Sequence, residues 1–457
     1  MMILKIGERM DKKILFVDVW GGIPMYPSLS IAYLSTIAKQ EGYRAEIISP
    51  NIVEDFSEEM FREYLELDKP EYVAFTLFTT QVFNAYRLIK VAKLCGCITI
   101  VGGPHVSSLG GEEVKEECPE IDFLFEKESE STFREFLKGN IKNNIIKMDK
   151  FSEINSISFP DRSAYKEEGW QFDSNYLKKP VHILISSRGC PYSCNFCYKD
   201  TFGRNYRQRS VDNVLDECEE IMKAGGKELY FIDDLFTLDK KWIIKFCQEK
   251  IRRGINLPFK CLGRADKLDD AILYNLKQAG CHTIAIGVES GNQEVVNWIN
   301  KNLKLEDVEK CVKLIHKYKI NVESYFIIGH RIDNEKTIDE TIEFARKINS
   351  DFPRFFLFSP YPGSRVWNEL PIEMKEKYWI KGTESDLRSI NPISICEVSP
   401  QRLVELWHKA HDWAYSYRYI KNIIREFFDK PFERIWFYKL KAWVGYGVFK
   451  LHKRRFK

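Results

Sequence analysis

The sequence predicts an α/β protein with two domains and a small helical C-terminal region, and three observations support this fold class. The chain has 457 residues, 44% of them hydrophobic, which allows two or three domains with sizeable cores. Apolar strand patterns alternate with helical patterns over residues 1–140, and a second alternating series begins at His182. Residues 141–180 lose this periodicity, so we expect a linker there.

The first domain, residues 1–140, is expected to be a doubly wound, flavodoxin-like sheet. Helical stretches such as LSIAYLSTIAKQ separate five predicted strands, at 14–20, 45–49, 72–78, 98–101 and 121–125. Sheets of this kind bind ligands beyond the carboxyl ends of their strands. Here those ends read VWGG, FTLFTT and VGGPH, and a glycine pair lets backbone approach a ligand closely. We therefore expect a ligand site at this edge of the sheet.

The second domain, residues 181–370, is expected to be a partial (β/α)6 barrel. Its predicted strands read HILISS, ELYFID, FKCLG, TIAIGV, VESYFIIG and FPRFFLFSP. A helical pattern follows each of the first five strands, as in a TIM barrel, but a full barrel has eight such units. The sequence therefore predicts an open TIM-like barrel, followed by a helical region over residues 371–457.

Three cysteines, Cys190, Cys194 and Cys197, lie within eight residues directly after the first strand of this barrel. Barrel enzymes place their chemistry at that rim. Iron–sulfur clusters are usually held by four thiolates, and a set of three leaves one iron with an open position, as in catalytic metal sites. The alternative is a zinc site with a fourth ligand elsewhere, such as His182. The other cysteines show no regular spacing, so we expect reduced thiols and no disulfides, as in a cytoplasmic protein.

The CxxxCxxC spacing, with Phe196 before the last cysteine, resembles the signature of radical S-adenosylmethionine (SAM) enzymes. The resemblance implies a four-iron, four-sulfur (4Fe-4S) cluster on the three cysteines, SAM as the ligand of the open iron, and a reductant such as flavodoxin or ferredoxin. Later motifs, among them SPYPGSRVW, follow the order found in the family. The residues that the resemblance assigns to SAM are Asp233 and Asp234 in FIDDLFT (methionyl ammonium), Arg264 in GRADKL (carboxylate), and Glu289 with Ser290 in IGVESG (ribose).

The motif VGGPHVS after the fourth strand is similar to the cobalamin-binding domain that precedes the barrel in one large subgroup of this family. The resemblance implies that cobalamin borders Thr76, Gly102, Gly103, Pro104 and His105. His105 is equally suited to cap its loop. The chain has no DxHxxG motif, and the resemblance then implies base-off cobalamin without a protein histidine ligand.

Three motifs depart from the subgroup's usual pattern. Residues 127–130 read KESE in place of GEGE, and Ser30 in PSLSIAYLS replaces a glycine. After the fifth barrel strand, His330 and Arg331 stand in FIIGHRIDNEKT where small residues and proline are usual. We therefore expect an atypical loop on the substrate side.

The resemblance implies a cobalamin-dependent methyltransferase that acts on an unactivated carbon of a small-molecule or lipid-like substrate, with the cofactors carrying the radical chemistry. A non-methylating oxidative cyclase or rearrangement enzyme with the same cofactors is the alternative, and no motif separates the two. A sensor that contains cobalamin and a cluster is a third interpretation. The expected SAM carboxylates Asp233, Asp234 and Glu289 weigh against a sensor, since it would not need them.

The net charge is only +3, but residues 419–457 carry eleven Lys/Arg against three Asp/Glu, which leaves −5 for the rest of the chain. In this tail, Ile420, Ile423, Ile424, Phe427 and Phe428 form an apolar stripe at helical spacing. The stripe either packs on the barrel or binds an anionic membrane surface, and the clustered aromatic residues disfavour nucleic acid. No signal peptide or membrane span is expected, which predicts a cytoplasmic protein, with peripheral membrane association at the cytoplasmic face as the alternative.

Overall fold

The computed structural model describes residues 12–19, 28–49, 56–148, 150–162, 176–375 and 393–429, with side chains to residue 414 in the last range. Contacts divide the chain into two compact units. The first comprises Met1–Gln171, Ile183–Glu217 and Ser359–Ile393, and the second comprises Phe172–His182, Cys218–Phe358 and Ser394–Lys457. The first unit therefore contains the cysteine triplet as well as the N-terminal sheet.

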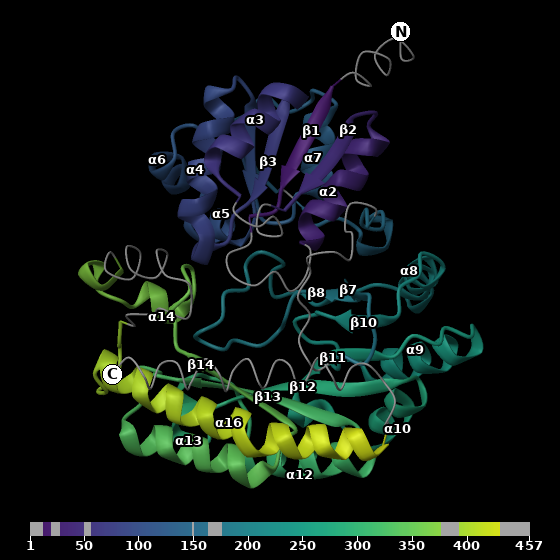
Figure 1. The fold of residues 1–457 in the computed structure, drawn as a ribbon, viewed down its shortest axis with the longest axis vertical. Coiled ribbons are helices and arrows are strands. Elements are labelled where there is room, and N and C mark those ends of the chain that lie inside the picture. The colour runs from purple at the N-terminus through teal and green to yellow at the C-terminus, as the bar shows by residue number, and fades with distance from the viewer. Residues whose placement is uncertain are drawn as a thin grey trace. The chain divides into compact units, whose positions relative to one another are not determined.

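The N-terminal sheet has six parallel strands in the order β2-β1-β3-β4-β5-β6. Figure 1 labels β1, β2 and β3 of this sheet. They are β1 Lys13–Val17, β2 Arg44–Ile48, β3 Tyr72–Thr76, β4 Ile98–Gly102, β5 Phe123–Glu126 and β6 Ile145–Lys147. The first five confirm the predicted strands and their flavodoxin-like order. Trp20, at the end of the first predicted strand, lies outside the described residues.

Of the segment expected to be a linker, the described residues 141–148 and 150–162 belong to this unit. They contribute β6, whose three residues include one buried side chain, Ile146, and are too few to show a strand period in the sequence. Further along, the Thr36 hydroxyl donates to the Phe159 carbonyl at 2.9 Å, and the Ser35 hydroxyl donates to Asp161 at 2.8 Å. The expected domain limits at residues 140 and 180 stay a prediction.

Helices cover both faces of the N-terminal sheet, which makes it doubly wound. Adjacent residues of β1 point to opposite faces, so Leu15 belongs to a core cluster with residues of α3 and α4, whereas Ile14 belongs to a second cluster with residues of α2 and α7. The helices are α2 Leu29–Gln40, α3 Glu58–Asp68, α4 Val82–Leu94, α5 Pro104–Leu109, α6 Gly111–Glu117 and α7 Glu130–Leu137.

The second sheet has the six strands that the sequence predicts for an open barrel, in the order β14-β13-β12-β11-β10-β7. They are β7 Val181–Leu184, β10 Glu228–Phe231, β11 Phe259–Gly263, β12 Cys281–Glu289, β13 Asn321–Ile328 and β14 Phe352–Leu357. The helices that alternate with them are α8 Val211–Lys223, α9 Lys240–Arg252, α10 Asp270–Gln278, α11 Gln293–Trp298, α12 Leu305–Lys317 and α13 Glu335–Ile348. Neighbouring strands from β10 to β14 pair in parallel, which confirms the (β/α)6 prediction.

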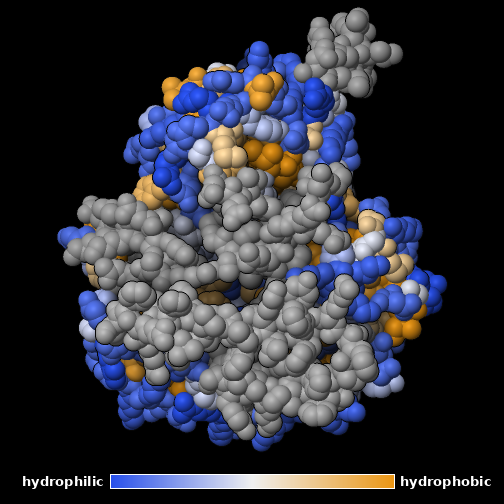
Figure 2. All heavy atoms as spheres, in the orientation of Figure 1, coloured by the Kyte–Doolittle hydropathy of each residue, from blue (hydrophilic) through white to orange (hydrophobic). Residues whose placement is uncertain are grey.

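The long helix α16 (Pro400–Asp429) packs on β14 in the second unit. The Trp407 indole donates to the Phe355 carbonyl at 2.9 Å, and Leu403, Leu406 and Ala410 are buried. Residues 430–457 of the basic tail lie outside the described residues, as do the side chains of 415–429. None of the described helices combines the length and apolar character that a bilayer crossing requires. On the face that Figure 2 shows, the described residues are mainly hydrophilic, with apolar residues in small separate groups.

Candidate functional site

The carboxyl ends of β3 and β4 form a tight edge in the N-terminal sheet. The Leu77 amide donates to the Gly102 carbonyl at 2.8 Å, and the His105 amide donates to the Leu77 carbonyl at 3.0 Å. Gly103 has φ 105°, and a Cβ there would lie 2.8 Å from both the Leu77 carbonyl oxygen and the Thr76 hydroxyl. Only glycine allows this closure without strain. Four of the five predicted cobalamin residues therefore lie at the edge where the sequence predicts a ligand: Thr76, Gly102, Gly103 and Pro104.

The fifth predicted residue, His105, points into the domain. Its side chain is fully buried, with Nδ1 3.1 Å from the Thr79 hydroxyl and Nε2 3.4 Å from the Tyr86 hydroxyl. Tyr86 in turn donates to Glu117 at 2.6 Å. These contacts suit the loop-supporting role that the sequence leaves open for His105, and its contact with cobalamin stays a prediction.

Asp18, which sequence reasoning missed, follows β1 and has a fully buried side chain. The Ser28 amide, just before α2, donates to its Oδ2 at 3.0 Å. Burial raises the pKa of this carboxyl to about 6, although the hydrogen bond from Ser28 lowers it. Close by in the chain, the hydroxyls of Ser28 and Ser30 lie 2.7 Å apart, and Ser30 lies 3.5 Å from the Thr76 hydroxyl. The signal was an acidic residue at the end of an apolar strand.

The cysteine loop, residues 189–206, is closed by an antiparallel hairpin of β8 (Ser187–Arg188) and β9 (Arg207–Gln208). The loop turns at Gly189, φ 84°, where a Cβ would lie 2.4 Å from the Asn205 carbonyl oxygen. Cys190 is buried, Cys194 is half-buried and Cys197 is exposed. The Lys199 ammonium donates to the Cys190 sulfur at 3.4 Å and to the Tyr192 carbonyl at 2.7 Å.

All twelve cysteines are among the described residues, and none of them forms a disulfide in this structure. No group of three His, Cys, Asp or Glu side chains in the described residues is close enough to hold a single metal ion. A cubane cluster spaces its thiolates more widely, because each binds a different iron. Three thiols on one loop supply soft donors of the kind that bind an iron–sulfur cluster.

The predicted SAM residues of the second unit lie after successive strands. Asp233 and Asp234 follow β10, where Asp233 is buried and Asp234 is exposed. Glu289 ends β12 at φ 70°, and Ser290 is buried with its hydroxyl 3.0 Å from that of Thr341. Asp234 therefore lies at the surface, whereas Ser290 is held within the protein.

Arg264, Lys301 and Glu289 form one buried network in this unit. The Arg264 guanidinium donates to Asp266 at 2.6 Å, to the Asn302 carbonyl at 2.9 Å and to the Lys301 carbonyl. The Lys301 ammonium donates to Glu289 Oε1 at 2.6 Å. Arg264 thus orients the loop that carries the partner of Glu289, and its contact with SAM stays a prediction. No local pattern in the sequence marked Lys301.

The two unusual residues after β13 differ in their surroundings. Arg331 is exposed, whereas His330 is fully buried, with ring centroids 4.9 Å from Phe358 and 6.3 Å from Trp298. Burial, and then the charge of Lys301, lower the pKa of His330 to about 3, so the ring is neutral. His330 therefore packs as an aromatic residue.

Sequence reasoning also missed a buried charge cluster on the second sheet. Lys260 of β11 pairs with Glu323 of β13, which accepts from the Arg354 guanidinium of β14 at 2.9 Å. Both Lys260 and Glu323 are about 3% exposed, and the Lys260 ammonium lies 4.8 Å from the Tyr230 ring centroid. The signal was a charged residue inside an apolar strand, in FKCLG and VESYF.

The side chains fit the cofactors that the sequence predicts. The glycine-closed edge carries hydroxyls at Thr76, Ser28 and Ser30, which can bind polar groups of a large ligand. The cysteine loop supplies three soft donors, and a carboxylate such as that of the surface residue Asp234 suits an ammonium group.

Comparisons with known proteins likewise assign the N-terminal part and the second part of the chain to two different families. Residues 24–137 match the B12 binding domain family, and residues 184–345 match the radical SAM superfamily. An uncharacterized methyltransferase of Pyrococcus horikoshii is 27% identical over 431 residues, which cover 88% of this chain and 90% of that protein. The anaerobic magnesium-protoporphyrin IX monomethyl ester cyclase of Rubrivivax gelatinosus is 26% identical over 385 residues, 77% of this chain and 68% of that protein.

Among solved structures, the radical SAM methyltransferase TsrM of Kitasatospora setae, with cobalamin and a [4Fe-4S] cluster bound, superposes with a TM-score of 0.64. The match covers 80% of this chain and 75% of TsrM at 16% identity, and so establishes similarity of fold alone. The two family matches are consecutive and fall on the two sheets described above. The chain therefore carries a B12-binding domain followed by a radical SAM domain.

Proposed function

We propose that this protein is a cobalamin-dependent radical SAM methyltransferase that acts on a carbon atom of a small-molecule or lipid-like substrate. The observation that carries the proposal is that one compact unit holds both the glycine-closed edge of the B12-binding sheet and the loop with three cysteines. An enzyme that uses both cofactors on one substrate needs their sites on a shared framework.

In this proposal Cys190, Cys194 and Cys197 hold a four-iron, four-sulfur cluster. When bound, the cluster, SAM and cobalamin supply the radical and methyl chemistry. The residues that bind SAM are Asp233, Asp234, Arg264, Glu289 and Ser290. Arg264 also holds the loop of Lys301, whose ammonium fixes the Glu289 carboxylate at 2.6 Å and so orients it for the ribose. A reductant such as flavodoxin or ferredoxin supplies the electron.

Cobalamin in this proposal lies against Thr76, Gly102, Gly103 and Pro104, in base-off form and without a protein histidine ligand. Support comes from His105, the histidine at this edge, which is fully buried and within hydrogen-bonding distance of Thr79 and Tyr86. It therefore supports the edge from inside the domain. Base-off binding predicts a characteristic absorption spectrum, and a base-on spectrum would contradict this part of the proposal.

The direct test uses anaerobically reconstituted full-length protein with SAM and a chemical reductant. We expect four irons per chain and release of 5′-deoxyadenosine. Cys194→Ala should lower the iron content and abolish 5′-deoxyadenosine, whereas Cys95→Ala, a half-buried cysteine at the end of α4, should change neither. Full iron content and activity in Cys194→Ala would contradict the cluster assignment.

The relative named as a cyclase supports a second candidate, a non-methylating oxidative cyclase with the same cofactors. The two candidates differ in their SAM-derived products. Methyl transfer yields S-adenosylhomocysteine as well as 5′-deoxyadenosine, whereas a cyclase yields 5′-deoxyadenosine alone. Productive turnover without S-adenosylhomocysteine would exclude the methyltransferase.

A further inference from the structure

The hairpin of β8 and β9 that closes the cysteine loop carries one buried and one half-buried arginine, both with carboxylate partners in the B12-binding region. Arg188 of β8 is 4% exposed, and its guanidinium contacts Glu130 at 2.6 Å and Glu128 at 3.2 Å. It also lies between two aromatic rings, 5.4 Å from the Tyr33 centroid and 5.1 Å from that of Phe202. Arg188 therefore joins the start of the cysteine loop to the segment after β5.

Arg207 of β9 repeats this arrangement at the other end of the loop. Its guanidinium pairs with both oxygens of Glu128, one of them at 3.1 Å, and stacks 4.1 Å from the Phe151 ring centroid. Glu128 is 4% exposed, so one buried carboxylate binds both strands of the hairpin. Paired arginine and carboxylate groups of this kind have a defined geometry, and removal of one partner leaves a buried charge unpaired.

Two further contacts attach the loop to the same region. The hydroxyl of Tyr198, the residue after Cys197, donates to the Ser107 carbonyl in α5 at 2.5 Å. The Ser107 hydroxyl accepts from the Lys127 amide at 2.8 Å, and Lys127 has φ 65°. This left-handed conformation agrees with the glycine that is usual at this position in the subgroup. Ser107 lies four residues after Gly103, in the helix that begins at the glycine-closed edge. The hydrogen bond from Tyr198 therefore links the residue after the last cysteine to that helix.

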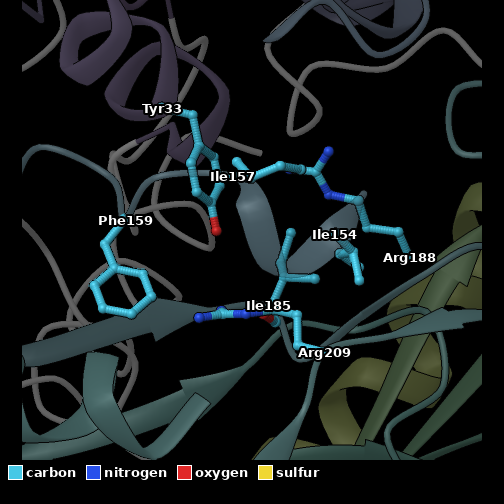
Figure 3. Close-up of a pocket in the computed structure, with 7 residues that line it drawn as sticks. All are labelled: Tyr33, Ile154, Ile157, Phe159, Ile185, Arg188 and Arg209. Atoms are coloured by element: carbon cyan, nitrogen blue, oxygen red, sulfur yellow. The ribbon is translucent and has the colours of Figure 1, made fainter. Parts of the chain in front are cut away.

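Beside the hairpin, Arg209 completes a third pair, with Glu217 at 2.5 Å, and its guanidinium lies 5.4 Å from the Phe159 ring centroid. Figure 3 shows Arg188, Arg209 and Tyr33 around one small cavity, together with apolar side chains. The apolar lining residues are Ile154, Ile157, Phe159 and Ile185. The space admits about one water molecule. These arginines are therefore engaged in packing and ion pairs, and the cavity is too small for a substrate.

We propose that Glu128, Arg188 and Arg207 are positioning residues that make the cysteine loop part of the B12-binding domain, so that the cluster and cobalamin sites move as one rigid body. The contact-based division agrees, because it places Ile183–Glu217 with Met1–Gln171 and the strands from β10 onward elsewhere. The identity of the two cofactors rests on the proposed function. The attachment of the cysteine loop to the B12-binding domain does not depend on the proposed function.

The first test is hydrogen exchange on the full chain without cofactors. Glu128→Gln keeps the side-chain volume and removes the charge shared by the two arginines, so amides of residues 190–206 should exchange at least tenfold faster. The matched control is Glu135→Gln, which alters the surface pair with Lys138 in the same domain and should leave the loop unchanged. Unchanged loop protection in Glu128→Gln would overturn the proposal.

A second variant keeps the test decisive if Glu128→Gln does not fold. Tyr198→Phe removes only the hydroxyl that donates to Ser107, and exchange should rise at residues 194–200 with protection elsewhere retained. Equal exchange in Tyr198→Phe and the unaltered chain would also count against the proposal.

The positioning role has its own readout in the reconstituted protein, the dipolar coupling between cob(II)alamin and the reduced cluster in pulsed electron paramagnetic resonance. The unaltered chain and Glu135→Gln should give one narrow distance distribution, and Glu128→Gln a broader one. An equally narrow distribution in Glu128→Gln would overturn the proposal. If the unaltered chain binds no cobalamin or cluster, the proposed function fails, and the exchange measurements still decide whether the loop is attached.

Discussion

Asp18 is a buried carboxyl whose charge costs stability. Its pKa is raised to about 6 by burial, from 3.8 in an exposed carboxyl. Below about pH 4 the carboxyl is protonated in both the folded and unfolded states and contributes nothing. Above about pH 6 the folded protein must hold a buried carboxylate that the unfolded chain exposes to water. Stability therefore falls as pH rises from about 4 to 6.

We expect Asp18→Asn to remove this cost, because an amide oxygen can still accept from the Ser28 amide. The variant should be more stable than the unaltered chain by up to about 3 kcal/mol at pH 7, and the difference should vanish near pH 4. Urea unfolding at a series of pH values measures it.

Asp122 provides a control, because its pKa is shifted in the opposite direction to that of Asp18. Burial favours a raised pKa there, but hydrogen bonds from Lys93 and from the Thr99 amide outweigh it and lower the pKa. Asp122→Asn should therefore destabilise the protein at pH 7, with the difference shrinking as pH falls below about 4. A stability difference for Asp18→Asn that does not vary with pH would contradict the assignment of the cost to the buried charge.

Lys199 gives a second prediction at the residue scale. Its ammonium donates to the Cys190 sulfur at 3.4 Å, and a positive charge and a hydrogen bond at a ligand sulfur stabilise a reduced cluster. Lys199→Gln should lower the midpoint potential of the reconstituted cluster by about 60 mV, equivalent to about 1.4 kcal/mol for one electron. A spectroscopic redox titration measures the shift.

The controls for Lys199 separate charge from position. Lys199→Arg keeps the charge and should shift the potential less, and Lys240→Gln, an exposed lysine paired with Asp269, should not shift it. An unchanged potential in Lys199→Gln would show that Lys199 does not act on the cluster.

At the scale of elements, the turn from β4 into α5 depends on Gly103. Gly103→Ala would place a Cβ 2.8 Å from the Leu77 carbonyl oxygen, in addition to the strain of φ 105°. We expect a loss of about 2–4 kcal/mol in unfolding free energy and weaker cobalamin binding, measured by urea unfolding and by absorption titration.

Gly110 is a matched control for this change, since its φ is 99° and nothing lies within 4 Å of a Cβ there. Gly110→Ala should show the backbone strain alone, about 1 kcal/mol, and leave cobalamin binding intact. Equal losses of unfolding free energy in Gly103→Ala and Gly110→Ala would mean that the close approach of Leu77 to Gly103 adds no cost to the backbone strain.

At the scale of the whole molecule, the basic tail has two alternative roles that an experiment can separate, membrane contact and packing on the barrel. Because α16 continues to Asp429 and its first half packs on β14, the informative truncation removes residues 430–457, which carry nine Lys/Arg against one Glu. If the tail binds membranes, the full chain floats with anionic liposomes at low salt and the truncated chain does not. Equal behaviour of the two chains in the soluble fraction would leave only the packing role.

The sequence by itself determined both sheets and the order of their strands except for β6, because parallel strands buried on both faces leave continuous apolar runs between helical periods. It also located the cysteine loop and the glycine edge, since metal ligands and left-handed turns require particular residue types at short spacing. These are local constraints. β6 was missed because three residues with one buried side chain carry too little pattern.

Only the tertiary structure decided which charged residues meet. Glu128 lies 60 residues before Arg188 and 79 before Arg207, and Lys260 lies 63 before Glu323. No sequence period relates such positions, because their contact depends on how loops and strands pack in space. The same holds for His105 and Asp18, whose burial depends on what covers them. Attachment of the cysteine loop to the B12-binding domain likewise follows from long-range ion pairs, whose partners a sequence leaves unspecified.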